Sequence, residues 1–182
     1  MNNLQKYYKE KTVPALIEKL GVKNVNAVPQ IKKVVLNVGL GQGLKDQAFL
    51  DLVKGNLAKI SGQRPVERKS TKSISNFKIR EGMIIGVMVT LRGKKMWDFL
   101  EKLIKITLPR VRDFRGIPAT GFDNGGNYSL GLKESTAFPE MQQDELEKVH
   151  GMQMTITTTA KNKKEGVALM QEIGFPFRPE EK

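Results

Sequence analysis

The sequence predicts an α+β fold, in which a mostly antiparallel sheet has helices packed on one face and the other face open. Three observations predict this class. Segments with apolar residues at helical spacing are interleaved with segments in which apolar residues alternate. The connections between them are irregular, unlike those of regular βαβ units. Two of the predicted strands also share one apolar face and one small, polar face, which is typical of antiparallel sheets.

The first predicted element is a helix over roughly 3–20. Its apolar residues fall on one side: Leu4, Tyr8, Leu16, Ile17 and Leu20. Gly21 can end this helix. Because Pro14 lies inside it, we expect a kink or a new start there, with Thr12 as a possible N-cap.

A strand over 32–40 comes next, and Asp46 can cap a second helix that runs to Ile60. A short strand around 65–69 follows. The stretch KSTKSISNFKIREG, residues 69–82, is polar and basic, so we expect an extended loop or an irregular hairpin that is mobile in the free protein.

A strand over 84–92 precedes a helix over 94–108, which we expect Pro109 to end. The pairs Asp98–Lys102 and Glu101–Lys105 support this helix at i, i+4 spacing. After a loop over 118–127, strands are predicted around 128–132 and 152–156. A capping box of Asn162 and Glu165 starts the last helix, and Gly174 ends it.

Length and composition predict one domain over residues 1–182, with parts 1–62, 63–93 and 94–182. Cysteine is absent, which excludes disulfides, thiolate nucleophiles and Cys-ligated zinc. The N-terminal segment has no apolar core of signal-peptide length. The longest apolar run, residues 83–89, is too short to span a bilayer. We therefore expect a soluble, cytoplasmic protein with no membrane partner.

The net charge is +12 and the isoelectric point is about 9.9, a balance that favours a polyanionic partner. The charge is unevenly distributed. Residues 64–115 carry 14 basic and 5 acidic side chains, whereas residues 134–182 carry 6 basic and 9 acidic ones. The middle of the chain is therefore the predicted contact with a polyanion.

Side chains alternate across a strand, so each of two strands can be divided into two faces. One face is apolar: Val34, Leu36, Val38 and Leu40 in the first strand, with Ile85, Val87, Val89 and Leu91 in the second. The other face is small, polar and basic: Val35, Asn37 and Gly39, with Gly86, Met88, Thr90 and Arg92. Gln63 could join this second face. It is either an ordinary solvated sheet face or a surface that approaches a nucleic-acid backbone.

The glycines of VVLNVGLGQGLKD raise the possibility of a dinucleotide-binding loop and hence of a nucleotide-dependent enzyme. The spacing differs from G-x-G-x-x-G, because the third glycine, Gly43, comes one residue early. Asp46 would place a carboxylate where the pyrophosphate should lie. Glu67 is only a loose candidate for the ribose-binding acid, and no Gly-Lys-Ser/Thr follows as a Walker motif requires.

The remaining candidates for catalysis or metal binding are isolated. His150 is the only histidine and favours a structural role at a helix end. The run Asp123–Gly126 lacks the alternating ligands of a calcium loop and favours a turn. The acidic run from Glu134 to Glu147 contains no convincing carboxylate pair. It is either a solvated face or a contact with a basic protein. We therefore predict no enzyme, no cofactor and no metal.

Phe77 lies within SISNFKIR, among basic residues. An aromatic side chain in that setting can stack on an unpaired base. It can equally anchor the hairpin by burying its ring, and the sequence alone leaves both possibilities open. For the chain as a whole, a further alternative to a specific RNA-binding protein is a basic protein that binds any nucleic acid.

Several stretches of the chain together resemble one family. They are VVLNVGLG, SISNFKIREG, GVMVTLR and LPRVRDFRG, followed by NYSLGL and the ending GFPF. In this order and spacing they resemble the bacterial form of the large-subunit ribosomal protein L-five family, over nearly the whole chain.

The resemblance implies a structural, cytoplasmic protein of the large ribosomal subunit that binds 5S rRNA and attaches it to the central protuberance. The open face of the sheet would then be open for RNA. Its other implied partners are 23S rRNA, P-site tRNA, the small-subunit head and other central-protuberance proteins. Implied rRNA-binding residues are Asn37, Gly39, Gln63, Phe77, Thr90 and Arg92. The implied tRNA loop, 72–82, offers Lys72, Ser73, Asn76, Lys78 and Arg80. The implied intersubunit-bridge surfaces offer Arg110, Arg112, Asp113, Glu134, Asp144 and Glu145.

Overall fold

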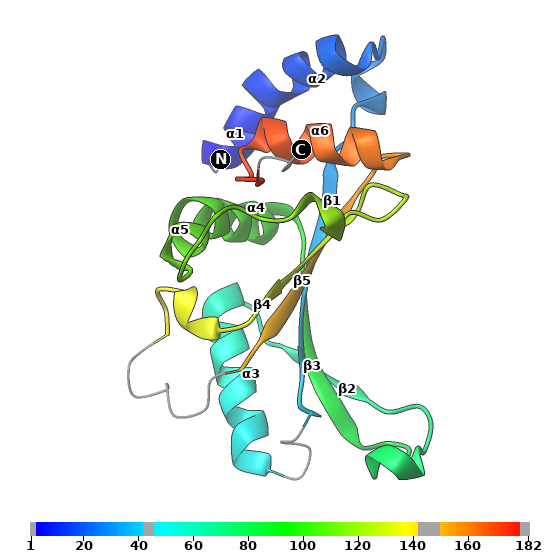
Figure 1. Cartoon of the computed structure of the whole chain (residues 1–182), viewed down its shortest axis with the longest axis vertical. Helices are drawn as coiled ribbons and strands as arrows, with labels where there is room; N and C mark the ends of the chain where they lie inside the picture. The colour runs from blue at the N-terminus through cyan, green and yellow to red at the C-terminus, as the bar shows by residue number, and fades with distance from the viewer. Residues whose placement is uncertain (1–2, 42–45, 142–149, 179–182) are drawn as a thin grey trace. The chain divides into compact units, whose positions relative to one another are not determined.

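The fold is α+β, as predicted. The computed structural model describes residues 3–41, 46–141 and 150–178. Five strands form an antiparallel sheet in the order β2-β3-β1-β5-β4 (Figure 1). They are β1 (Ile31–Gly39), β2 (Val66–Lys69), β3 (Ile84–Leu91), β4 (Tyr128–Leu132) and β5 (Met152–Thr158).

Residue contacts divide the chain into two compact units, each assembled from separate stretches of sequence. Unit 1 comprises Met1–Val34, Leu91–Leu130 and Thr155–Lys182, and unit 2 comprises Val35–Thr90 and Gly131–Met154. The single domain expected over residues 1–182 stays a prediction.

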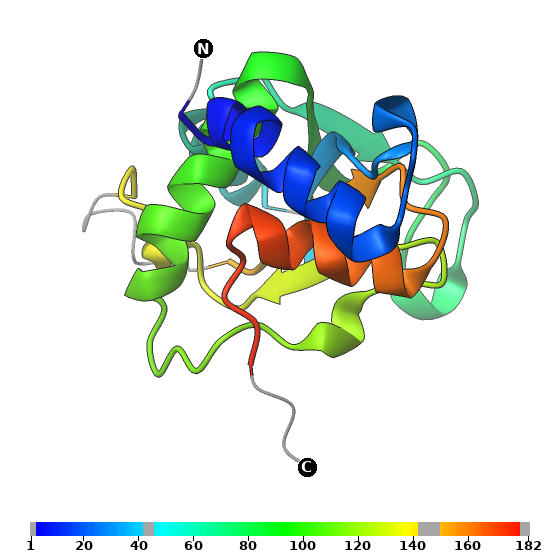
Figure 2. The same cartoon turned by 90° about the horizontal axis from the view of Figure 1, so that it is seen from above.

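In the described part of unit 1, the α- and π-helical segments form three runs. The first is α1 (Asn3–Tyr7), η1 (Tyr8–Thr12) and α2 (Val13–Leu20); the second is α4 (Gly93–Lys102), η5 (Leu103–Thr107) and α5 (Leu108–Arg110); the third is α6 (Lys163–Ile173). Contacts join α1 to α4 and α2 to α6 (Figure 2). Tyr8 contacts two other parts of unit 1 from the first run. Its hydroxyl donates to the Pro29 carbonyl at 3.0 Å, and its ring lies 5.3 Å from that of Trp97 in α4.

The α-helix α2 begins at Val13, beside Pro14, and the run that contains Pro109 ends at Arg110, so both expectations hold to within one residue. In each case a π-helical segment, η1 or η5, ends two residues before the proline. Val13 donates to the Tyr8 carbonyl and Leu108 to the Leu103 carbonyl, both across five residues. A proline has no N–H for the carbonyl four residues back and its ring needs room there. The wider π turn supplies that room, so helical backbone continues past each proline.

The predicted helix ends are confirmed with one exception. The Asp46 carboxylate accepts from the Phe49 N–H at 3.1 Å and begins α3 (Gln47–Ser61). Asn162 accepts from the Glu165 N–H at 2.9 Å, and the Glu165 carboxylate reaches back to the Lys161 N–H. Thr12 is not an N-cap. Its backbone is helical, and its hydroxyl donates to the Glu172 carbonyl instead.

Short 3-10 turns connect several elements: η2 (Val25–Ala27), η4 (Ser75–Phe77), η6 (Ala119–Gly121) and η7 (Ser135–Ala137). In β4 and β5 the residues alternate strictly between buried and more exposed positions. Tyr128, Met154 and Ile156 are among the buried side chains that the sheet contributes to the core.

Candidate nucleic-acid interface

The strands of unit 2 have one buried face and one accessible face, as their alternation predicts. Leu36 and Val38 of β1 are buried, whereas Asn37 is half-buried and Gly39 is exposed. In β3, Val87 and Val89 are buried, while Met88 and Thr90 are half-buried. The apolar face is less complete than expected, because Ile85 is only half-buried.

The register of β2 extends this accessible face by two residues. Val66 pairs with Met88 and Arg68 pairs with Gly86, so both side chains lie on the side of Met88 and Thr90. Val66 is 60% exposed and Arg68 is exposed. We call the set Val35, Asn37, Gly39, Val66, Arg68, Met88 and Thr90 the outward face.

The opposite side of β2 faces α3. Glu67 pairs with Val87 and forms an ion pair with Lys54 of α3. The hydrogen bond to Glu67 is the main cause of a raised pKa of Lys54. This contact engages the carboxylate that was the loose candidate for a ribose-binding acid.

The two glycines of the outward side have different surroundings. A Cβ on Gly86 would lie 3.0 Å from the Val38 carbonyl oxygen, so this glycine permits close approach of β1 to β3. A Cβ on Gly39 would meet nothing within 4 Å. Space beside Gly39 is therefore open to a ligand's backbone.

Gln63 contacts β3 at Thr90, and its place on the outward face stays a prediction. Its side-chain amide donates to the Thr90 carbonyl at 3.2 Å, and its own N–H donates to the Ser61 hydroxyl. Gln63 thus ties the end of α3 to β3 beside the Thr90 side chain. No pattern in the sequence indicated this contact, which spans 27 residues.

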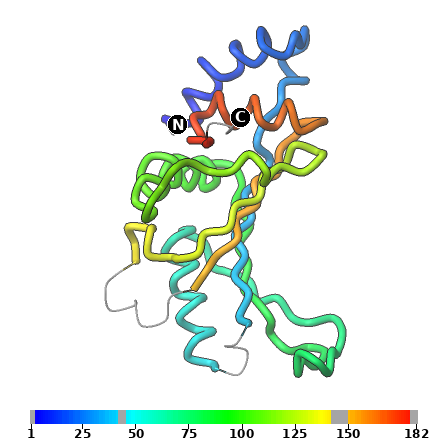
Figure 3. Tube along the Cα trace, viewed as in Figure 1, coloured from blue at the N-terminus to red at the C-terminus, as the bar shows by residue number. Residues whose placement is uncertain are grey.

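Residues 70–83 join β2 to β3 and form the irregular hairpin that the sequence suggested; we call them the basic hairpin (Figure 3). Ser70 donates to the Met83 carbonyl, and Ile74 and Ile79 donate to each other's carbonyls. Lys78 has a left-handed backbone, with φ of 55°, at the tip. The mobility of the basic hairpin in the free protein stays a prediction.

The tip of the basic hairpin exposes the residues that the resemblance assigns to RNA. Phe77 is 68% exposed and Ile74 is 44% exposed, so neither ring nor branched side chain anchors the hairpin. The assigned polar residues are also exposed: Lys72, Ser73, Asn76, Lys78 and Arg80. Ser73 is partly engaged, because its hydroxyl accepts from the Glu81 N–H at 2.9 Å.

The other predicted site residues belong to both units. Arg92, Arg110, Arg112 and Asp113 belong to unit 1, and all four are exposed. Glu134 belongs to unit 2, and its carboxylate accepts from the Thr136 hydroxyl. The predicted bridge residues Asp144 and Glu145 lie outside the described residues, as does Gly43 of the glycine turn.

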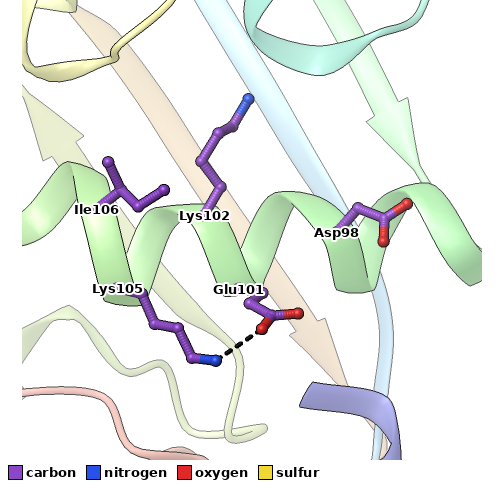
Figure 4. A pocket seen from close by; sticks show the side chains of 5 residues that line it. All are labelled: Asp98, Glu101, Lys102, Lys105 and Ile106. Carbon is purple, nitrogen blue, oxygen red and sulfur yellow. Dashed lines mark hydrogen bonds and ion pairs between the residues drawn. The ribbon is translucent and has the colours of Figure 1, made fainter. Parts of the chain in front are cut away.

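A shallow pocket of about 360 Å³ lies on α4 and η5 in unit 1. Its lining residues are Asp98, Glu101, Lys102, Lys105 and Ile106 (Figure 4). Glu101 and Lys105 form a 2.6 Å ion pair, while Lys102 points away from them. The described residues contain no group of three or more potential metal ligands.

His150 is buried in unit 2, where it is 5% exposed. The Asn56 side-chain amide lies 3.3 Å from its Nε2, and its Nδ1 lies 3.4 Å from the Gly151 carbonyl. Since Asn56 donates to Nε2, the proton of the neutral ring is on Nδ1. Burial lowers the pKa of His150 below its usual 6.5, and the Gly151 carbonyl opposes this in part.

We expect the free energy of unfolding to fall as the pH drops below about 6.5, the usual pKa of histidine. The folded state holds His150 neutral, so the unfolded state binds the proton first and is favoured by acid. Urea unfolding between pH 7 and pH 5 measures this. His150→Gln should show a shallower decline, and identical declines would contradict the assignment.

The comparisons with known proteins cover almost the entire chain. Residues 24–80 match the family described as ribosomal protein L5, and residues 84–177 match the model of the C-terminus of the same ribosomal family. A Burkholderia multivorans protein named large ribosomal subunit protein uL5 is 50% identical over 178 residues, covering 98% of this chain and 99% of that protein. The protein of the same name from Ralstonia pickettii is 49% identical over 175 residues, covering 96% of this chain and 97% of that protein.

The accessible basic surface and these matches define a ribosomal protein. The chain belongs to the ribosomal protein L5 family. Members of this family are structural, non-enzymatic constituents of the large ribosomal subunit. The resemblance and the prediction of no enzymatic activity are therefore confirmed. In the part of the chain that the structure describes, no helix is long and apolar enough to cross a membrane.

Proposed function

We propose that this chain binds 5S rRNA through the outward face and the basic hairpin, as a structural constituent of the cytoplasmic large ribosomal subunit. It thereby attaches 5S rRNA to the central protuberance, with 23S rRNA and other proteins of that region as neighbours. The observation that supports this most is the accessible side of β1, β2 and β3, which continues into a hairpin of exposed cations. Family membership supports the large subunit as its setting.

The outward face offers the groups that a sugar–phosphate backbone requires. The Asn37 amide donates and accepts, the Thr90 hydroxyl does both, and Arg68 supplies a cation. Open space beside Gly39 lets the RNA backbone come close. Gln63 has its amide N–H engaged by the Thr90 carbonyl, so it holds the site together as well as lining it. Arg92 is a further proposed contact.

Asn37→Ala and Thr90→Ala should each weaken binding of 5S rRNA about tenfold. Each removes one polar contact of roughly 1.5 kcal/mol, and 1.4 kcal/mol corresponds to a factor of ten. Both side chains are only half-buried, so the fold should survive. Filter binding at fixed, moderate salt measures the affinity, because the affinity for phosphates depends steeply on salt.

Gln153→Ala is the matched control for these two variants. Gln153 is an exposed polar residue of β5, also in unit 2, and is not assigned to the RNA site. The Gln153→Ala variant should bind 5S rRNA with the affinity of the wild type. Wild-type affinity in both Asn37→Ala and Thr90→Ala would refute the proposed site. Equal displacement of 5S rRNA by an unrelated duplex would instead favour a general nucleic-acid binder.

The basic hairpin is also the proposed contact with the elbow of P-site tRNA. Its cations Lys72, Lys78 and Arg80 are exposed, and hydrogen bonds within the hairpin support its shape. The left-handed backbone at Lys78 places that residue at the turn itself. In unit 1, Arg110, Arg112 and Asp113 are exposed and offer one proposed contact with the small-subunit head. Glu134 in unit 2 offers another.

A further inference from the structure

The C-terminal segment of the described chain lies beside a loop rich in arginine (Figure 2). We call residues 110–116 the arginine loop; its exposed cations are Arg110, Arg112 and Arg115. Ile117, directly after the loop, forms a parallel bridge with Phe177. The Ile117 N–H donates to the Pro176 carbonyl at 2.8 Å, and the Arg178 N–H donates to the Ile117 carbonyl at 3.0 Å.

Arg178 adds a side-chain contact to the loop itself. Its Nε donates to the Gly116 carbonyl at 2.9 Å. Gly116 has φ of +94°, and a Cβ there would lie 2.8 Å from the Arg178 backbone nitrogen. Only glycine therefore allows the loop and the C-terminal segment to come this close.

Aromatic packing holds the same segment in place. The Phe177 ring lies 5.7 Å from that of Phe122 and 5.8 Å from that of Tyr128. The Tyr128 hydroxyl donates to the Pro118 carbonyl at 2.9 Å, just after the loop. At the other end of the loop, Val111 donates to the carbonyl of buried Leu108. Both ends of the arginine loop are thus fixed to the core of unit 1.

We propose that Arg178, with residues 175–177, is a positioning clamp that holds the arginine loop in the conformation in which it contacts the small-subunit head. This inference rests on the proposed function of that loop. A loop held in its bound conformation loses less conformational entropy on binding, which strengthens the contact. Arg178 acts on Gly116 and Ile117 rather than on the partner, so it is a positioning residue.

Two full-length variants break the clamp in different ways. Arg178→Ala removes the side-chain hydrogen bond and one charge, whereas Gly116→Ala displaces the C-terminal segment and leaves every arginine in place. Lys164→Ala on α6 is the control for loss of one exposed charge in unit 1. Arg112→Ala reports on the contact of the loop with its partner.

Hydrogen exchange of the Ile117 amide measures the clamp in the free protein. Both clamp variants should exchange about two- to thirteenfold faster, as expected for a lost hydrogen bond of roughly 0.5–1.5 kcal/mol. Sucrose-gradient analysis at limiting magnesium then measures how well large subunits carrying each variant join small subunits. Large subunits that carry either clamp variant or Arg112→Ala should join small subunits less well than wild type. Large subunits that carry Lys164→Ala should join as well as wild type. The affinity of the clamp variants for 5S rRNA should stay at the wild-type level. A general loss of structure would lower that affinity.

The outcomes separate the clamp from the proposed contact. Unchanged exchange of Ile117 in both clamp variants overturns the clamp. The clamp is also overturned if Arg112→Ala reduces joining and the two clamp variants do not, although the contact of the loop then stands. If Arg112→Ala joins as well as wild type, the proposed contact fails and the function assigned to the clamp fails with it.

Discussion

Gly166→Ala is expected to lower the stability of unit 1 by roughly 1–3 kcal/mol, although alanine is the better helix former. A Cβ on Gly166 of α6 would lie 2.5 Å from the Gly126 carbonyl oxygen and 2.7 Å from its Cα. These are backbone atoms, so a side-chain rotation cannot relieve the clash. Thermal unfolding followed by circular dichroism should show a midpoint lower by roughly 2–12 °C.

The turn that faces Gly166 has little freedom to move away. Gly126 has φ of +74°, and its carbonyl accepts from the buried Thr158 hydroxyl at 2.9 Å. Asn127 is held on both sides, since its amide group contacts the Asp123 carboxylate and its side-chain oxygen accepts from the Thr158 N–H. Overpacking against such a turn displaces α6 or breaks these hydrogen bonds.

Gly55→Ala is the matched control, because the same substitution in another helix should have the opposite sign. Gly55 lies inside α3, and a Cβ there would meet nothing within 4 Å. Alanine should therefore stabilise the protein by roughly 0.5–1 kcal/mol through helix propensity alone. A thermal unfolding midpoint for Gly166→Ala at or above the wild-type value would contradict the prediction. It would show that the turn and α6 move apart at little cost in free energy.

The features that could be predicted from sequence are those that depend on neighbouring residues. Alternation in β1 and β3 gave the two faces, and Asp46 and Asn162 gave two helix starts, because capping uses residues three positions apart. The helices around Pro14 and Pro109 were less predictable. A π turn and a broken helix have nearly the same apolar spacing, and only the surrounding packing decides between them.

The contacts that shape the candidate site could not be predicted because they join distant residues. The Lys54–Glu67 ion pair, the Gln63–Thr90 hydrogen bond and the Asn56–His150 contact all depend on the sheet register and on where α3 lies. His150, for which the sequence favoured a structural role, is a buried, neutral side chain, and residues 142–149 of the expected helix end lie outside the described residues. The positions of Asn37 and Thr90, by contrast, followed directly from alternation within single strands.

Phe77→Ala should weaken binding of 5S rRNA by roughly 1–3 kcal/mol, or about five- to 150-fold, while leaving the unfolding midpoint almost unchanged. Base stacking and anchoring of the hairpin, the two interpretations of Phe77, predict opposite effects on affinity and on stability. A stacking ring contributes to affinity and not to stability, whereas a ring that anchors the hairpin contributes to stability first. At 68% exposed, the ring buries too little area to anchor anything.

Phe77→Tyr is the control that separates stacking from the shape of the hairpin tip. Tyrosine keeps the π face and the size of the ring, so affinity should stay near the wild-type value, whereas Phe77→Leu keeps only the apolar bulk and should bind weakly. Filter binding and thermal unfolding of all three variants decide the matter. If Phe77→Ala lowers the unfolding midpoint in proportion to the affinity, the ring is structural and Arg68 with the basic residues of the hairpin must carry the RNA contact. If Phe77→Leu binds as well as Phe77→Tyr, the ring makes an apolar contact rather than stacking on a base.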